Sequence, residues 1–142
     1  MKNTFTPLLF ASLAVLFFSC DMEFEPVQRF DFYLQGTWVT NNPNDIKYEP
    51  GTIVIDFDTI TISGFGINSN YPNAVRPFNG FAKDVPLKGY SEINALFIYN
   101  AGTWQRISYY LEDQGIGKNN LLFLTFGTDA AILQKKTSRY NE

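Results

Sequence analysis

The chain contains no histidine and only one cysteine among its 142 residues. Without imidazole, the histidine-assisted serine and cysteine nucleophiles are excluded. The common zinc sites are built from cysteine and histidine, so these sites are excluded as well. The glycine motifs that cradle nucleotides, GxxxxGK[ST] and a strand-linked GxGxxG, are also missing. We therefore expect a protein that is not an enzyme and that holds neither a metal nor a cofactor.

An excess of positive charge is also lacking. The chain has 11 lysine and arginine residues against 14 aspartate and glutamate residues, which gives a net charge of −3. Nucleic-acid binding needs a basic face, so we expect no nucleic-acid partner. The one basic cluster, Lys135, Lys136 and Arg139, is interpreted as a solvated tail near the C-terminus.

No apolar run is long enough to span a membrane. The run at residues 8–18 counts 11 residues, whereas a spanning helix needs about 20 and a secretory apolar region about 7–15. Lys2 precedes this run, and Ser19 and Cys20 follow it. This order is typical of a bacterial lipoprotein signal. We predict that residues 1–19 are a signal peptide and that Cys20 receives acyl chains such as palmitate; the alternative is plain secretion with a free thiol.

Acidic residues follow the predicted lipid site at Asp21, Glu23 and Glu25. They resemble the short export signal that sends some Gram-negative lipoproteins to the outside of the outer membrane. The sequence therefore predicts an outer-membrane protein that is anchored through lipid at Cys20 and displayed on the cell surface. The alternative is the periplasmic face, with the acidic residues serving only as a solvated tether.

Removal of the signal leaves 142 − 19 = 123 residues, enough for one domain. We assign residues 20–32 to a lipidated tether and residues 33–142 to the domain. Apolar residues alternate with polar ones from Gly36 onward, as half-buried strands require. The predicted strands cover residues 37–40, 52–57, 59–63, 84–90, 93–100, 103–111, 121–126 and 130–136. Residues 66–80, rich in asparagine and proline, form a long loop, and we expect an apolar ligand pocket near it.

Short strands at even spacing favour an antiparallel barrel or sandwich. About eight strands leave an interior that side chains fill or that holds one small ligand. We therefore predict an all-β fold, a small antiparallel β-barrel of about eight strands. The alternatives are an OB-like half-open barrel and an open sandwich.

The segment Gly36-Thr37-Trp38, after a short helical turn, resembles the G-x-W motif of lipocalins. The strand order over residues 30–137 is similar to the small lipocalin-like domains of bacterial lipoproteins. The resemblance implies that Trp38 closes one end of the barrel and that Arg139 packs over it. It also implies binding of a small apolar or amphipathic molecule. The chain lacks the disulfide of many secreted lipocalins and is shorter than a typical member.

Three side chains on the longest predicted strand are candidates for ligand binding. Trp104, Arg106 and Tyr110 share one face, because alternate residues of a strand point the same way. If that face lines a cavity, it forms a clamp for a sugar or another flat ligand. If it is exposed, we expect Arg106 to stack on Trp104. Arg76, in the loop at 66–80, is a candidate to reach an anionic ligand at the barrel mouth; the alternative is an ordinary exposed arginine of the loop.

A second function remains open beside ligand binding in the barrel. A structural or accessory lipoprotein would have a filled barrel and would contact another envelope protein or a glycan through an exposed apolar patch. A catalytic carboxylate pair would have to consist of Asp56 and Asp58. Both lie at a predicted hairpin tip, where aspartate is an ordinary turn residue.

Overall fold

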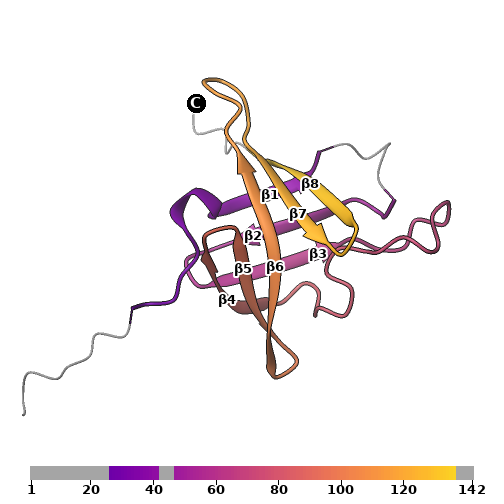
Figure 1. The fold of residues 1–142 in the computed structure, drawn as a ribbon, viewed down its shortest axis with the longest axis horizontal. Coiled ribbons are helices and arrows are strands. Elements are labelled where there is room, and N and C mark those ends of the chain that lie inside the picture. Colours follow the sequence, from indigo (N-terminus) through magenta and orange to yellow (C-terminus); the bar gives the residue numbers. More distant parts are fainter. Residues whose placement is uncertain (1–25, 42–46, 137–142) are drawn as a thin grey trace, which may run out of the picture.

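The computed structural model describes residues 26–41 and 47–136. Cys20, the predicted signal peptide and Arg139 lie outside the described residues. A short 3-10 helix, η1 (Phe32–Leu34), precedes eight strands. The strands are β1 (Gly36–Thr40), β2 (Gly51–Ile55), β3 (Thr59–Gly64), β4 (Pro86–Glu92), β5 (Ala95–Asn100), β6 (Thr103–Glu112), β7 (Leu121–Phe126) and β8 (Asp129–Lys135) (Figure 1). In the described part of the chain, no helix is long and apolar enough to cross a membrane.

The strands form one closed barrel. Each strand pairs antiparallel with the next, and β8 pairs back onto β1 through Trp38↔Lys135 and Thr40↔Leu133. This closure leaves no strand edge unpaired, which removes the hazard of edge-to-edge association. The predicted small, lipocalin-like antiparallel barrel of eight strands is confirmed. The OB-like and open-sandwich alternatives are wrong, because the last strand meets the first.

The interior of the barrel is filled with side chains. Ile53 and Ile55 in β2 face inward beside Ile60 and Ile62 in β3, as their alternation predicts. The largest fully buried side chains are Trp38, Phe30, Phe78, Leu34, Ile53, Ile55, Ile60, Ile62, Leu96, Ile98, Leu122 and Leu124. They belong to one apolar cluster. The burial of this cluster is the main favourable term in folding.

The barrel has two different ends. At the tether end, the chain enters β1 from residues 26–35, near the β2–β3 and β4–β5 turns; the β6–β7 loop belongs to the same end and projects at the top of the view in Figure 1. The opposite end, called the plug end, carries the β3–β4 loop with residues 66–80, the β5–β6 turn and the β7–β8 turn. The two ends therefore present different loops.

The tether end is closed by the segment that precedes β1. Phe30 is fully buried, and its ring lies against Gly89 so closely that a Cβ there would be 2.5 Å away. Asp31 caps η1 by accepting a hydrogen bond from the Tyr33 backbone N–H. Leu34 is buried beneath the same turn and accepts a hydrogen bond from Trp38 Nε1 at 2.7 Å. The short helical turn expected before Trp38 is present, and Phe30 is part of the core.

The plug end is closed by the long loop. Phe65 and Phe78 are buried, and their ring centroids are 5.6 Å apart. Both residues have positive φ, 60° and 54°, a region that bulky side chains rarely adopt. Such backbone strain persists only where the surrounding contacts outweigh it. The Phe78 ring also contacts Phe126 at 5.1 Å. The loop therefore plugs the barrel mouth.

Tyr48 provides a test of packing at the plug end. It is 3 % exposed and contacts the Phe65 ring, and its hydroxyl donates to the Ala130 carbonyl at 3.4 Å. Burial, helped by the charge of Asp129, raises the pKa of Tyr48 to about 12 from 10.0. Because the folded pKa is raised, this contribution to stability is complete below pH 10 and is lost as the pH rises through 12. The loss amounts to roughly 2–3 kcal/mol.

Tyr48→Phe should therefore flatten the loss of stability between pH 10 and 12. At pH 7 we expect a change of less than about 1 kcal/mol, because the lost hydrogen bond is long. Urea unfolding at pH 7 and at pH 11 measures both effects. Tyr33→Phe is the matched control, because Tyr33 is an exposed tyrosine. An alkaline loss as steep in Tyr48→Phe as in the unmodified protein would contradict the assignment.

Candidate functional site

The predicted clamp on β6 lies on the outside of the barrel. Ile107 points inward and pairs with Leu96, so Trp104, Arg106 and Tyr110 point outward and are exposed. Of the two orientations left open for this face, the structure has the exposed one, because the strand alternation places Ile107 inside. Arg106 donates a hydrogen bond to Ser108 Oγ at 3.2 Å.

Aromatic side chains from three strands gather beside Trp104. The outer aromatic face consists of Tyr90, Phe97, Tyr99 and Trp104 on β4, β5 and β6. Tyr90 stacks on Phe97 with centroids 4.9 Å apart and planes 8° apart. Trp104 meets Tyr90 edge-on at 5.2 Å and tilts against Tyr99 at 5.3 Å. Tyr99 and Trp104 keep 43 % and 42 % of their surface exposed, so part of this face is free to contact a ligand.

The strand register adds charge to this face. Tyr90 pairs with Phe97, and Phe97 pairs with Arg106. These three residues form one row across β4, β5 and β6, and the positively charged Arg106 is the last residue of the row. Tyr110 lies on the same face of β6, but its ring contacts Phe123 on β7. The structure thus groups Trp104 with Arg106 and places Tyr110 toward the other end of the strand.

A pocket at the plug end brings two of the predicted residues together. Its volume is about 280 Å³, and its lining includes Arg76, Arg106, Phe78, Phe81 and Phe126. We call it the arginine pocket. The two arginines lie on different elements, the long loop and β6. Among the described residues, neither guanidinium makes an ion pair. Two cations without anionic partners make this pocket attractive to an anion.

The charge of Arg76 also affects the pKa of a neighbouring lysine, Lys83. Burial lowers the pKa of Lys83; the nearby carboxylate of Asp84 raises it, and the charge of Arg76 lowers it further. The Lys83 ammonium lies over the rings of Phe65 and Phe78 and donates to the Phe78 carbonyl at 3.0 Å. Arg76 and Lys83 therefore place two positive charges near the aromatic plug, with the carboxylate of Asp84 beside Lys83.

Asp129 fastens the loop that carries Arg76. Its carboxylate accepts a hydrogen bond from Lys47 Nζ at 2.8 Å and from the Val75 backbone N–H at 3.0 Å. The hydrogen bond from Lys47, with that from the Val75 N–H, lowers the pKa of Asp129. Asn100 holds the following part of the loop, because its side chain bonds Ala82 N–H and the Gly80 carbonyl. The position of Arg76 thus depends on contacts that are distant in sequence.

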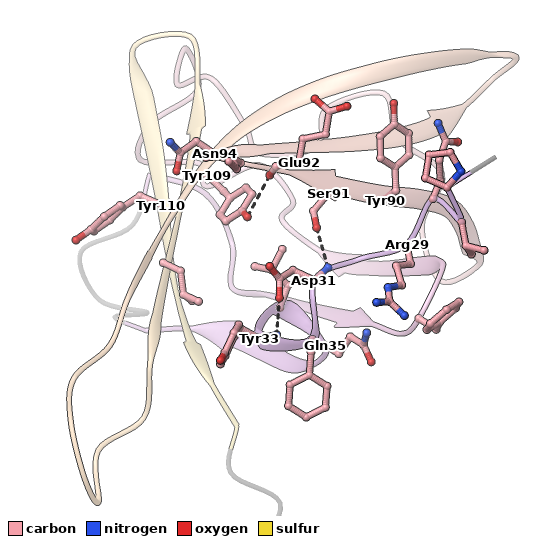
Figure 2. Close-up of a pocket in the computed structure, with 18 residues that line it drawn as sticks. Arg29, Asp31, Tyr33, Gln35, Tyr90, Ser91, Glu92, Asn94, Tyr109 and Tyr110 are labelled. Atoms are coloured by element: carbon pink, nitrogen blue, oxygen red, sulfur yellow. Dashed lines mark hydrogen bonds between the residues drawn. The ribbon is translucent and has the colours of Figure 1, made fainter. Parts of the chain in front are cut away.

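A larger groove lies at the tether end (Figure 2). Its volume is about 1050 Å³, and it lies between residues 26–35, the β4–β5 turn and the end of β6. In Figure 2, Asp31, Ser91 and Tyr109 stand near its centre, and Tyr110 points away. Sequence reasoning missed this groove. The available signal was the aromatic pair Phe32 and Tyr33 at the end of the predicted tether.

Polar groups line the floor of the groove and bind one another. The Asp31 backbone N–H donates to Ser91 Oγ at 2.7 Å, and the Tyr109 hydroxyl donates to the Glu92 carbonyl at 3.3 Å. Burial, with the charge of Asp31, raises the pKa of Tyr109. Arg29 lies over the Phe57 ring at 5.5 Å. The groove is thus amphipathic, with satisfied polar groups inside and aromatic groups along its rim.

Trp38 packs under a cation from the last strand. The Lys135 ammonium lies 5.3 Å from the centroid of the Trp38 ring and donates to the Tyr33 carbonyl at 3.0 Å. Burial lowers the pKa of Lys135. The resemblance to lipocalins assigned this place to Arg139, which lies outside the described residues. Lys135 occupies it, because the register Trp38↔Lys135 brings the two together.

The remaining acidic residues do not form a site in the described structure. Asp56 and Asp58 are both exposed at the β2–β3 turn, as their hairpin position predicts. Within residues 26–41 and 47–136, no three acidic side chains come together as a set of metal ligands.

Comparison with known proteins gives no relative. No protein-family model, no curated protein and no solved structure matches the chain.

Proposed function

We propose that the chain is a lipid-anchored, non-catalytic lipoprotein of the bacterial outer-membrane surface that binds an anionic glycan at the plug end of a lipocalin-like barrel. The observation that carries the proposal is the arginine pocket, which Arg76 and Arg106 both line, with Arg106 also in the row of Tyr90 and Phe97 on the outer aromatic face. The anchor is supported by the position of Cys20 behind its short apolar run.

The outer aromatic face and the arginine pocket match the two kinds of surface on an acidic sugar, its apolar ring faces and its carboxylate. The C–H faces of a sugar ring are apolar and stack on exposed aromatic rings such as Trp104 and Tyr99. A carboxylate is bound in a bidentate manner by a guanidinium, for which Arg76 and Arg106 are available. The outer aromatic face ends on Arg106, so one ligand can contact rings and cation together.

A ligand inside the barrel is the other candidate. The small apolar or amphipathic ligand expected from the resemblance would need interior space, but buried side chains fill the interior and Phe78 plugs the mouth. Entry would require displacement of the loop that Asp129 and Asn100 hold. The outer surface needs no such rearrangement, and we favour it for that reason.

Isothermal titration of the purified protein with hexagalacturonate, and with neutral cellohexaose for comparison, tests the proposal. We expect binding of the acidic oligosaccharide only. Trp104→Ala should weaken that binding about fivefold, since loss of a stacking contact costs roughly 1 kcal/mol. Arg106→Gln should weaken it by tenfold or more, since hydrogen bonds to charged groups contribute about 1.5–3 kcal/mol.

Tyr110→Ala is the matched control, because it removes an exposed aromatic residue from the same face of β6 that contacts Phe123 instead. Its affinity should equal that of the unmodified protein. Equal losses in Tyr110→Ala and Trp104→Ala would place the site elsewhere. Binding of neither oligosaccharide, or of both equally, would contradict an anionic glycan of this kind.

A further inference from the structure

We infer that the tether end of the barrel rests on the lipid bilayer and inserts its apolar loop tips among neutral headgroups. This inference relies on the proposed lipid anchor at Cys20, and it adds a second contact with the membrane. Its basis is a set of exposed apolar side chains at the tether end, which includes the two most exposed large apolar residues of the described structure, Ile93 and Ile116.

Every connection at the tether end carries a large exposed apolar residue. The β2–β3 turn presents Phe57, the β4–β5 turn presents Ile93, and the β6–β7 loop presents Ile116. Ile93 is 91 % exposed and Ile116 is fully exposed. Turns favour glycine, asparagine, aspartate, serine and proline, so local turn geometry does not call for isoleucine at these tips. Their exposure indicates a partner with an apolar surface.

The segment before β1 continues this apolar rim. Phe32 is 78 % exposed, and Val27 and Tyr33 are exposed beside it. These residues line the same groove as Phe57 and Ile93, so they surround one amphipathic floor (Figure 2). Aromatic residues favour the boundary between headgroups and hydrocarbon, and polar groups on the floor would lie at headgroup level.

The length of the tether identifies the bilayer as the occupant. Six peptide steps separate Cys20 from Pro26, the first described residue. At about 3.6 Å or less per step, Pro26 lies within roughly 22 Å of the lipid-bearing residue. Because Pro26 itself lines the groove, the anchor holds the apolar rim close to the membrane. The arginine pocket is then at the far end, where it faces the medium.

The charges around the rim indicate which lipids fit. Asp56 and Asp58 flank Phe57 and are exposed, and Glu92 precedes Ile93. Carboxylates at these positions oppose an anionic membrane and leave neutral headgroups as the favoured surface. We therefore expect the contact to form on zwitterionic lipid and to be insensitive to salt, unlike binding by a basic patch.

Environment-sensitive labels on the lipidated protein test this orientation. With the sulfur of Cys20 acylated, a cysteine introduced at Ile93 or at Thr128 would be the only free thiol. Thr128 is the matched control, an exposed residue in the β7–β8 turn at the plug end. In phosphatidylcholine vesicles we expect a nitrobenzoxadiazole label at Ile93→Cys to rise several-fold in emission and to be quenched by spin-labelled lipid. The label at Thr128→Cys should remain in water.

The outcomes separate this inference from the proposed function. Protein that floats with the vesicles while both labels remain in water would overturn the bilayer contact and leave the anchor intact. Protein that does not float would overturn both. Shielding of the Ile93 label in the soluble Cys20→Ser protein, rising with protein concentration, would identify a second copy of the chain as the occupant and would overturn the bilayer contact as well.

Discussion

Replacing Cys20 by serine will release the protein from the membrane fraction into the soluble fraction. Each buried methylene of an acyl chain contributes about 0.8 kcal/mol, and two chains or more anchor a protein stably. Serine offers no thiol to receive them. Contact through the tips at Phe57, Ile93 and Ile116 is too small by itself to retain the protein during fractionation. Immunoblotting of membrane and soluble fractions measures the release.

Two further measurements check the predicted lipid anchor at Cys20. The mass of the unmodified protein, purified from membranes, should exceed that of residues 20–142 by the mass of the acyl groups. The thermal unfolding midpoint of Cys20→Ser should match that of the unmodified protein, because every barrel strand lies within residues 36–135. A membrane-bound Cys20→Ser protein, or an unmodified thiol in the purified protein, would refute the anchor.

Trp38→Ala will lower the free energy of unfolding by about 3–5 kcal/mol, the range for loss of a large buried aromatic side chain. Trp38 is fully buried, and its Nε1 donates to the Leu34 carbonyl. The substitution would leave a cavity at the tether end, and the Lys135 ammonium would lose the ring beneath it. The Leu34 carbonyl would lose its donor as well. Urea unfolding, followed by circular dichroism, measures the difference.

Trp104→Ala is the matched control, because it removes the same side chain from the outer aromatic face. With 42 % of Trp104 exposed, we expect a loss of about 1 kcal/mol or less. We therefore expect Trp38→Ala to affect mainly the stability of the barrel and Trp104→Ala to affect mainly the proposed binding of the ligand. Equal destabilisation by the two substitutions would contradict the assignment of Trp38 to the closed end of the barrel.

Local pattern predicted the elements well. The strand predicted at 52–57 is observed as β2 (Gly51–Ile55), and that at 103–111 as β6 (Thr103–Glu112). Alternation is a local property, since successive side chains of a strand point to opposite faces. The same pattern could not say which face of β6 turns inward. The orientation of β6 follows from the pairing of Ile107 with Leu96. This orientation places the candidate residues Trp104, Arg106 and Tyr110 on the outer surface of the barrel.

The long loop shows the limit of prediction more clearly. Its asparagine and proline residues correctly indicated a segment without regular structure, and a pocket lies beside it, but they did not predict that the loop enters the barrel. Phe78 instead reaches into the barrel with positive φ, at a backbone cost that its packing against Phe65 and Phe126 offsets. No local pattern predicts such a plug, because the compensating contacts come from residues distant in sequence.

The chain alone determined the all-β class, the approximate strands and the turn before Trp38, because each depends on neighbouring residues, and the predicted anchor signal at Cys20 is likewise a local pattern. Tertiary structure decided the closure through β1 and β8, the pairing of Lys135 with Trp38, the pocket shared by Arg76 and Arg106, and the position of Phe57 and Ile93 beside one groove. These features depend on register around the barrel, where a shift of one residue would turn every side chain of a strand to the other face.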